Sequence, residues 1–269
     1  MSDSGKKRTA PAIVDMKSQG QKIVCLTAYD ALLAMLLDQS GVDLILVGDS
    51  GAMVFAGHKT TIPFTTDQMV YHTQAVSRGV QHALLISDMP FLSYQISVDD
   101  ALRNAGRLIQ EGGAQGVKVE GGEHMAETVR RLVKMGIPVM GHLGLTPQSI
   151  NQFGGYRLRG KKEPESEEIR KDAKILEEAG VFAVVLEKIP SALAGQITAS
   201  LSIPTIGICA GPQCDGQILV THDMLGLFEQ FKPRFARQYV NLAGMIREAV
   251  IHYAEDVKKG DFPGDKESY

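Results

Sequence analysis

Apolar runs rich in β-branched residues alternate with stretches of helical spacing along most of the chain. Each run is apolar at consecutive positions, as expected of a strand that is buried on both faces. Between the runs, apolar residues recur at intervals of three and four, the spacing of an amphipathic helix. The pattern predicts eight strands within residues 22–30, 43–50, 83–90, 114–122, 137–145, 181–189, 203–211 and 216–224, and helices within 31–39, 66–79, 98–110, 126–135 and 169–179.

This alternation predicts a parallel sheet covered by helices, because parallel strands need long crossover connections. Eight such units in about 250 residues match the size of a (β/α)₈ barrel, the TIM-barrel form of the α/β class. A doubly wound open sheet is the alternative, but no phosphate-binding glycine loop follows the first run. We expect one domain over residues 1–269, with residues 1–21 as an N-terminal helix or arm and residues 260–269 as a frayed tail.

Composition narrows the classes of function. The 269 residues are 44% hydrophobic and 22% charged with a net charge of −3, so no nucleic-acid partner is expected. No apolar run is long enough for a bilayer, and the first 20 residues lack the apolar core of a secretory signal. We therefore expect a cytoplasmic protein without a membrane partner. The cysteines, Cys25, Cys209 and Cys214, lack zinc-ribbon spacing and are interpreted as small apolar fillers.

Four of the apolar runs end on an acidic residue, namely Asp49, Asp88, Glu120 and Glu187. In a (β/α)₈ barrel the C-terminal strand ends form the face that carries active sites, so we expect these side chains to gather there. Lys118 lies two residues before Glu120, and residues two apart on a strand project to the same side. A buried lysine and a buried glutamate each need a partner charge, because burying an unpaired charge costs several kcal/mol.

Clustered carboxylates repel one another unless a cation neutralises them. Oxygen ligands suit Mg²⁺, and no His or Cys group has zinc-ligand spacing, so Asp49, Asp88 and Glu120 are candidate magnesium ligands. The alternative for each acid is structural. In this alternative, Asp49 and Ser50 only start a helix, and Asp88 only ends a strand. Glu120 then forms an interior salt bridge with Lys118.

Two further strand-end residues are candidates for chemistry. His142, in the fifth run, is suited to bond a substrate oxygen or to shuttle a proton, with a buried structural histidine as the alternative. Glu187 is a candidate base, and its alternative is a surface pair with Lys188. Strand alternation sends those two side chains in opposite directions, which favours the role as a base.

Longer motifs carry a resemblance to a known family. Over about Lys22 to Pro263 the chain contains, in order, LTAYDA, VGDS, GHKTTIPFTTDQMVYHTQAVSRG, SDMPFLSY, GVKVEGG, GHLGLTPQS, VLEKIP and IGICAGPQCDGQILVTHDMLG. In these blocks the sequence resembles the ketopantoate hydroxymethyltransferase family. The resemblance implies a (β/α)₈ barrel of the phosphoenolpyruvate/pyruvate-binding type and a homo-oligomer, typically a decamer. It also implies roles for site residues: Asp49, Asp88 and Glu120 at Mg²⁺, Asp49, Ser50, Asp88 and Lys118 at the keto acid, and Glu187 as the catalytic base.

The reaction that the resemblance implies has 3-methyl-2-oxobutanoate and 5,10-methylenetetrahydrofolate as substrates and 2-dehydropantoate and tetrahydrofolate as products, in pantothenate synthesis. The C3 proton of a keto acid is weakly acidic, and Mg²⁺ on the keto oxygen would stabilise the enolate. A related Mg²⁺-dependent lyase or mutase acting on a small 2-keto acid is one alternative, which the GHKTTIPFTTDQM block disfavours. A non-catalytic keto-acid-binding protein is another, but it would need neither Glu187 nor Lys118.

Overall fold

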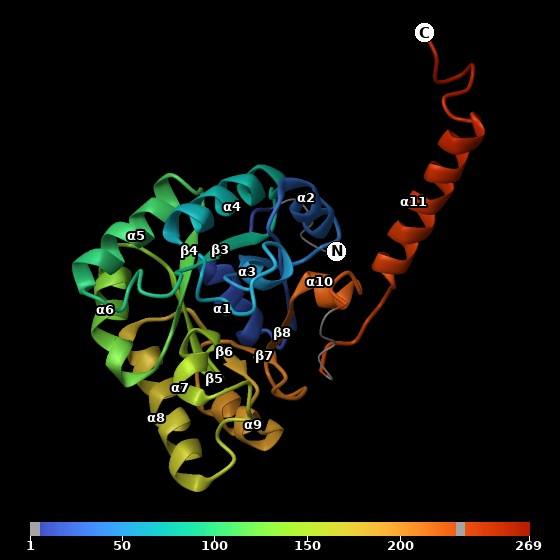
Figure 1. Cartoon of the computed structure of the whole chain (residues 1–269). Coiled ribbons are helices and arrows are strands. Elements are labelled where there is room, and N and C mark those ends of the chain that lie inside the picture. The colour runs from blue at the N-terminus through green and yellow to red at the C-terminus, as the bar shows by residue number, and fades with distance from the viewer. Residues whose placement is uncertain (1–5, 230–234) are drawn as a thin grey trace. The chain divides into compact units, whose positions relative to one another are not determined.

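The computed structural model describes residues 6–229 and 235–269 of the chain. The chain divides into two compact units, Met1–Leu219 and Val220–Tyr269. The first unit is a closed barrel in which consecutive strands pair in parallel and β8 pairs with β1 (Figure 1). This confirms the predicted (β/α)₈ architecture. The strands are β1 (Ile23–Thr27), β2 (Leu44–Val47), β3 (Leu84–Asp88), β4 (Gly116–Glu120), β5 (Val139–Gly144), β6 (Ala183–Glu187), β7 (Thr205–Ile208) and β8 (Gly216–Leu219).

Helices connect the strands and lie around the outside of the barrel (Figure 1). The first turn of α4 is held by a capping box, in which Thr65 accepts from the N–H of Gln68 and Gln68 accepts from the N–H of Thr65. The barrel helices are α2 (Ala31–Gln39), α4 (Thr66–Gly79), α5 (Val98–Gln110), α6 (Ala126–Lys134), α8 (Glu163–Ala179) and α9 (Ser191–Ser200). Shorter elements lie in the connections: α3 (Gly51–Val54), η1 (Glu123–Met125), η2 (Pro147–Ser149) and α7 (Ile150–Phe153).

The strands are shorter than the apolar runs that predicted them. The strand predicted within residues 43–50 ends at Val47, and Ser50 has helical dihedral angles as the N-cap residue of α3, which agrees with the helix start considered for Asp49 and Ser50. Residues 221–224, in the last apolar run, form the short helix α10 (Thr221–Met224). Apolar content does not distinguish a strand end from the first turn of a short buried helix, so the runs extend past the strand ends. The strands β2, β3 and β4 are buried at every position, as the continuous runs predicted.

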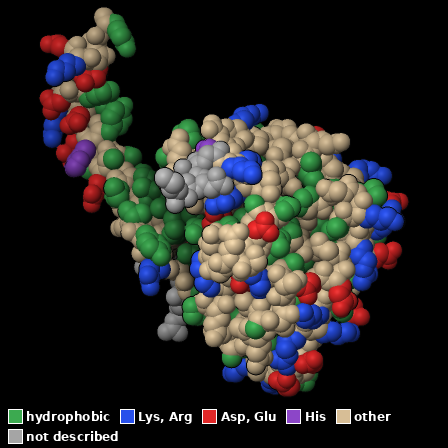
Figure 2. Space-filling view, turned by 180° about the vertical axis from the view of Figure 1, so that it is seen from behind, with side chains coloured by type: hydrophobic (Ala, Val, Ile, Leu, Met, Phe, Trp, Pro, Cys, Tyr) green, Lys and Arg blue, Asp and Glu red, His purple; other side chains and the backbone are tan. Residues whose placement is uncertain are grey.

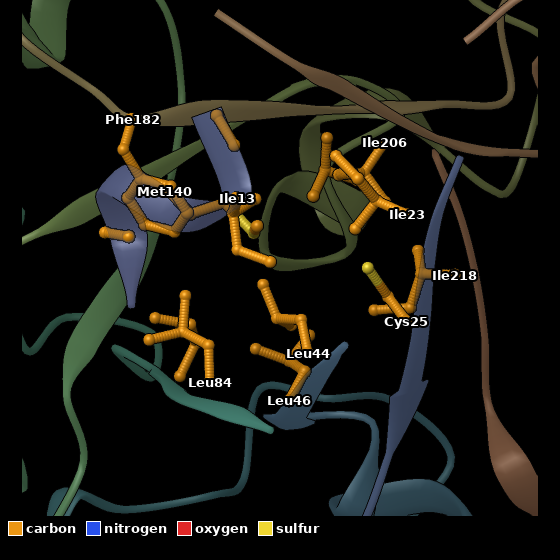
Figure 3. Close-up of a cluster of buried hydrophobic side chains, with 14 of the residues drawn as sticks. Ile13, Ile23, Cys25, Leu44, Leu46, Leu84, Met140, Phe182, Ile206 and Ile218 are labelled. Carbon is orange, nitrogen blue, oxygen red and sulfur yellow. The ribbon is translucent and has the colours of Figure 1, made fainter. Parts of the chain in front are cut away.

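Helix α1 (Ala10–Ser18) supplies the predicted N-terminal helix. Pro11 stands in its first turn, where proline is tolerated because no intrahelical N–H bond is lost. The side chain of Ile13 is fully buried in a cluster with residues from the beginnings of the strands, among them Ile23 and Leu44 (Figure 3). Helix α1 therefore closes the N-terminal end of the barrel, opposite the strand ends that carry the acids.

The second unit contains α10 and the longer helix α11 (Leu242–Lys259). Helix α11 ends at Gly260, whose φ of 78° is the left-handed conformation that favours glycine. Several of its apolar side chains are exposed, including Ile246 and Val250, and hydrophobic side chains gather along this helix in Figure 2. The single domain expected over residues 1–269 stays a prediction, as does the frayed tail.

The surface of the barrel unit seen in Figure 2 carries acidic and basic side chains interspersed with one another. This agrees with the small net charge of the chain. Among the helices in the described residues, none combines the length and the apolar character that a membrane span requires.

Replacing Ile13 with alanine tests the closure of the barrel by α1. The change removes a fully buried side chain and leaves a cavity, so we expect the free energy of unfolding to fall by about 2–5 kcal/mol. Urea denaturation followed by circular dichroism measures it. Ile96→Ala, at a side chain that is 68% exposed, is the matched control and should change stability by less than about 0.5 kcal/mol. Equal losses in the two variants would contradict the packing described for α1.

Candidate active site

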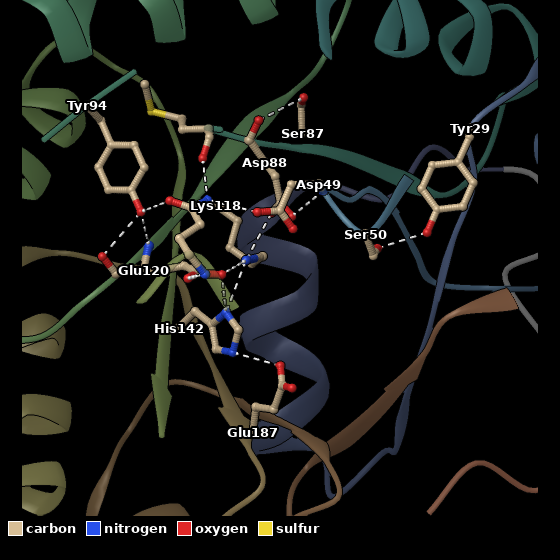
Figure 4. A network of polar contacts seen from close by, with 12 residues as sticks. Tyr29, Asp49, Ser50, Ser87, Asp88, Tyr94, Lys118, Glu120, His142 and Glu187 are labelled. Carbon is tan, nitrogen blue, oxygen red and sulfur yellow. Dashed lines mark hydrogen bonds and ion pairs between the residues drawn. The ribbon is translucent and has the colours of Figure 1, made fainter. Parts of the chain in front are cut away.

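The register of neighbouring strands brings the predicted site residues together at the C-terminal end of the barrel. Asp88 on β3 pairs with Lys118 on β4, and Glu120 on β4 pairs with His142 on β5. Glu187 on β6 pairs with a β5 residue two positions after His142. Their side chains point toward one another inside the barrel (Figure 4).

Lys118 is the central cation of this group. Its Nζ lies 3.1 Å from Oδ1 of Asp88 and 3.7 Å from Oε1 of Glu120. The same Nζ lies 3.2 Å from Nδ1 of His142. The Lys118 side chain is buried, which by itself lowers the pKa of the ammonium, but the charges of Asp88, then Glu120, outweigh burial and raise it. Lys118 is therefore a permanent positive charge, and the interior salt bridge considered for Glu120 and Lys118 is present.

His142 connects Glu120 to Glu187. Its Nδ1 lies 3.2 Å from Oε1 of Glu120, and its Nε2 lies 3.2 Å from Oε2 of Glu187. Burial and the charge of Lys118 lower the pKa of the imidazole, but the interactions with Glu120 and Glu187 outweigh them and raise it to about 9. When protonated, His142 is a second cation between two carboxylates, and its Nδ1 then donates to Glu120 and does not accept from the ammonium of Lys118. Lys188 is turned elsewhere, because its φ of 50° redirects the chain after the strand and its Nζ donates to the carbonyl oxygen of Tyr156.

Asp49 and Asp88 are held against each other although both are acids. The backbone N–H of Asp49, which lies two residues after β2, donates to Oδ2 of Asp88 at 2.9 Å. Burial, followed by the charges of Asp88 and Glu120, raises the pKa of the Asp49 carboxyl to about 8. Burial also raises the pKa of Asp88, against the opposing effect of Lys118. The two carboxyls lack sufficient positive charge around them.

The group as a whole also has more negative than positive charges. Four carboxylates face the two cations Lys118 and His142, so full ionisation would leave two negative charges in a buried site. Oδ1 of Asp88 and Oε1 of Glu120 are buried oxygens that make no hydrogen bond within the described residues, only ion pairs. Buried oxygen donors with surplus negative charge are suited to a hard divalent cation.

The acids as they stand do not surround a metal position. Within the described part of the chain, no three His, Cys, Asp or Glu side chains are grouped closely enough to hold an ion. The ammonium of Lys118 lies within 4 Å of both Asp88 and Glu120 and interacts with the oxygens that a metal would contact. The three predicted ligands are thus neighbours, and their role in binding Mg²⁺ stays a prediction.

Ser50 lies beside this group but bonds to a different partner. Its Oγ is 2.9 Å from the hydroxyl of Tyr29 (Figure 4). The Tyr29 hydroxyl donates to Oγ1 of Thr27 at 3.0 Å. Ser50 is the N-cap residue of α3, yet its side chain makes no capping hydrogen bond. The backbone of Ser50 therefore starts a helix, as considered for Asp49 and Ser50. Its hydroxyl does not cap that helix and lies beside the site.

The sequence interpretation missed Gln148 and Tyr94. The Gln148 amide donates from Nε2 to Oδ2 of Asp49 at 2.9 Å, and the Tyr94 hydroxyl donates to Oε1 of Gln148 at 2.8 Å. Both side chains are buried. Neither residue ends an apolar run, so the signal that identified the acids did not apply to them. Their only sequence signal was membership in the motifs GHLGLTPQS and SDMPFLSY.

A cavity of about 520 Å³ opens beside Glu120, which is the one strand-end acid among its lining residues. Its size and its mixture of aromatic and polar side chains suit a small organic molecule. It extends from the site toward the beginning of α8. Residues on its walls include Phe91, Tyr94, Glu120, Gln148, Arg159 and Asp172.

Comparison of the sequence with known proteins identifies the family of this chain. The family model described as ketopantoate hydroxymethyltransferase matches residues 7–265. The chain belongs to the ketopantoate hydroxymethyltransferase family. It is 57% identical to 3-methyl-2-oxobutanoate hydroxymethyltransferase of Chlorobium phaeobacteroides over 97% of this chain and 96% of that protein. It is 55% identical to the protein of the same name from Pelobacter propionicus over 100% of both chains.

Solved structures of other proteins share the barrel fold of this ketopantoate hydroxymethyltransferase chain. A 2,3-dimethylmalate lyase of the PEP mutase/isocitrate lyase superfamily has a TM-score of 0.61 at 16% identity, over 97% of this chain and 91% of that one. A phosphonopyruvate hydrolase solved with oxalate and Mg²⁺ has a TM-score of 0.60 at 13% identity, over 97% and 93%. At these identities the likeness concerns the fold alone.

The elevated pKa of His142 leads to a measurable titration in this ketopantoate hydroxymethyltransferase site. A folded-state pKa above the ordinary 6.5 means that the protonated form contributes to stability below pH 6.5, and that this contribution is lost as pH rises toward about 9. We expect the imidazole ¹⁵N shifts of the metal-free protein to titrate with a midpoint near 9. The variant His142→Gln assigns the resonance, and Glu187→Gln should lower the midpoint. A midpoint at or below 6.5 would contradict the contacts described.

Proposed function

We propose that this chain transfers a hydroxymethyl group from 5,10-methylenetetrahydrofolate to 3-methyl-2-oxobutanoate, with water consumed and 2-dehydropantoate and tetrahydrofolate formed. The two relatives compared above, at 55% and 57% identity, carry the name of this activity. The observation that carries the proposal is the buried network from Asp88 through Lys118 and His142 to Glu187, at the C-terminal face of the barrel. Such a network supplies what deprotonation of a keto acid requires: a fixed cation and a positioned base.

Glu187 is our candidate for the base that removes the proton from C3 of the keto acid. Its side chain is 16% exposed, so it can reach a substrate while most of it is shielded from water. Nε2 of His142 lies 3.2 Å from Oε2 of Glu187, an ion-pair contact without hydrogen-bond geometry. The resulting enolate carbon then forms a bond to the one-carbon unit, and water supplies the hydroxyl oxygen of that unit. Both bonds from the one-carbon unit to folate nitrogens break, and these nitrogens take up the C3 proton and one proton of the water.

Lys118, Ser50 and Asp88 are our candidates for binding the keto acid. The ammonium of Lys118 suits the substrate carboxylate. The hydroxyl of Ser50 lies 2.9 Å from that of Tyr29, whose own proton is donated to Thr27, so Ser50 donates to a substrate oxygen only by turning away from Tyr29. His142 contributes a further donor at the same face of the barrel.

Asp49, Asp88 and Glu120 are our candidates for holding Mg²⁺. They fit the ion because they are buried oxygen donors in a group with surplus negative charge, and two of their oxygens lack hydrogen bonds within the described residues. When bound, Mg²⁺ would act as a Lewis acid on the keto oxygen and make the C3 proton more acidic. The relief of repulsion would also return the Asp49 carboxyl to its ionised form.

The alternatives from other classes are less well supported. The lyases and mutases that share the fold are 12–16% identical to this chain, far below the two hydroxymethyltransferases. A non-catalytic keto-acid-binding protein would not need the contact of His142 with Glu187. The homodecamer and the cytoplasmic location stay predictions, and sedimentation velocity measures the former.

Exchange of the C3 proton of 3-methyl-2-oxobutanoate into deuterated water tests the proposed function directly. We expect the protein to catalyse exchange that requires Mg²⁺ and does not require folate, because enolisation precedes transfer. Proton NMR follows the loss of the C3 signal, with protein stripped of metal by a chelator as the control. Absence of Mg²⁺-dependent exchange by the wild type would rule out the mechanism.

Glu187→Gln tests the assignment of the base. An amide does not accept the proton, so we expect the exchange rate to fall by about 10²- to 10⁴-fold, while calorimetry still detects binding of the keto acid. Glu178→Gln, at an exposed position of α8, is the matched control with an unchanged rate. If Glu187→Gln exchanges as fast as this control, another residue is the base.

A further inference from the structure

A buried glutamine with no part in the proposed chemistry lies against the acids. Gln148 belongs to η2, in the connection after β5, and only 5% of it is exposed. Its Nε2 donates to Oδ2 of Asp49 at 2.9 Å, and its backbone N–H donates to Oε2 of Glu120 at 3.0 Å. We propose that Gln148 is a positioning residue that holds these two carboxylates in the orientation that Mg²⁺ binding requires. The inference rests on the magnesium site of the proposed function.

The amide of Gln148 is fully engaged, which fixes its orientation. Besides the bond to Asp49, Nε2 donates to the carbonyl oxygen of Met89 at 2.9 Å. Oε1 accepts from the hydroxyl of Tyr94 at 2.8 Å and from Nε2 of Gln95 at 3.0 Å. A flipped amide would set its oxygen against two other oxygens, and its nitrogen against donors. All four hydrogen bonds of the side chain therefore favour the same orientation of the amide, in which Nε2 faces Asp49.

Tyr94 connects this amide to the strand that carries Glu120. Its hydroxyl accepts from the backbone N–H of Glu120 at 3.0 Å (Figure 4). The same hydroxyl donates to Oε1 of Gln148. The ring is 1% exposed, so the position of the hydroxyl is set by packing. Glu120 is thus tied to Gln148 twice, through its own carboxylate and through Tyr94.

The backbone donor of Gln148 has its own structural cause. Pro147 begins η2, and the first N–H groups of a helical turn have no partner inside the turn. The N–H of Gln148 is one of them, and it donates to Oε2 of Glu120. A single short turn therefore contacts Asp49 through a side chain and Glu120 through the main chain.

The neutrality of Gln148 matters for a cation site. A lysine or arginine at this position would also donate to Asp49, but it would cancel the negative charge that attracts Mg²⁺. The amide orients the carboxylate and leaves the charge of the group unchanged. Lys118 contacts Asp88 and Glu120, whereas the side chain of Asp49 accepts a hydrogen bond from the neutral amide of Gln148. Asp49 is in this respect distinct from the other two candidate ligands.

Gln148→Leu tests the inference, because leucine has a similar size and makes no hydrogen bonds. We expect the dissociation constant for Mg²⁺ alone, measured by isothermal titration calorimetry on the full chain, to rise about 10- to 100-fold, as is usual when a partner of a metal ligand is removed. We also expect the C3 exchange rate to approach that of the wild type once Mg²⁺ is saturating, since Gln148 does not touch the substrate. A merely structural role would not be relieved by added metal.

Two further variants keep the test decisive if Gln148→Leu does not fold, which circular dichroism and thermal unfolding reveal. Tyr94→Phe removes only the hydroxyl that joins Gln148 to Glu120, so it should raise the same dissociation constant by a smaller factor. Gln110→Leu replaces an exposed glutamine at the end of α5 and should leave Mg²⁺ binding unchanged.

The outcomes separate this inference from the function on which it rests. A Mg²⁺ affinity in folded Gln148→Leu or Tyr94→Phe that equals that of Gln110→Leu overturns the positioning role and leaves the proposed function intact. An exchange rate of folded Gln148→Leu that stays low at saturating Mg²⁺ also overturns it. Failure of the wild type to bind Mg²⁺ overturns the magnesium site, and the positioning role with it.

Discussion

The ammonium group of Lys118, buried among carboxylates, is the interaction on which this site depends. Without it, Asp88 and Glu120 would be buried acids on adjacent strands with no cation between them, a situation whose cost in free energy is large. The strand register satisfies this requirement, because Lys118 pairs with Asp88 across one strand boundary and precedes Glu120 by two residues. Even so, burial and mutual repulsion leave the pKa of Asp49 raised. The site is therefore stable as it stands and still electrostatically prepared for one more cation.

The closed barrel makes such an arrangement possible by separating the residues that stabilise from those that react. At one end, α1 inserts Ile13 among the apolar residues that begin the strands. At the other end, the strands deliver acidic and basic side chains from β3, β4, β5 and β6 to one place. Because every strand has two neighbours, the register at the reactive end cannot slip without breaking the packing at the closed end. The same rigidity holds the ion pairs at fixed distances.

Neutral side chains also contact the charged residues of the site. Gln148 and Tyr94 reach across from two different connections and donate hydrogen bonds where another cation would reduce the negative charge. His142 links the candidate metal acids to Glu187, so the candidate base shares one chain of contacts with the residues proposed to bind Mg²⁺. The adjacent cavity is lined in part by Glu120, Tyr94 and Gln148, so a molecule bound there would contact the same network. Positioning and chemistry are thus served by residues from separate parts of the chain.

The sequence alone determined the barrel and the acids at its strand ends, because both follow from local patterns: continuous apolar runs, helical spacing between them, and a charge where each run stops. It left the strand ends open, as at Ser50 and residues 221–224, where short helices follow the strands. The tertiary structure alone decided that Lys118 contacts Asp88, that His142 joins Glu120 to Glu187, and that Gln148 reaches Asp49, 99 residues away. These contacts depend on the strand register and on closure of the sheet. A one-residue shift in register would turn the same side chains to the opposite face.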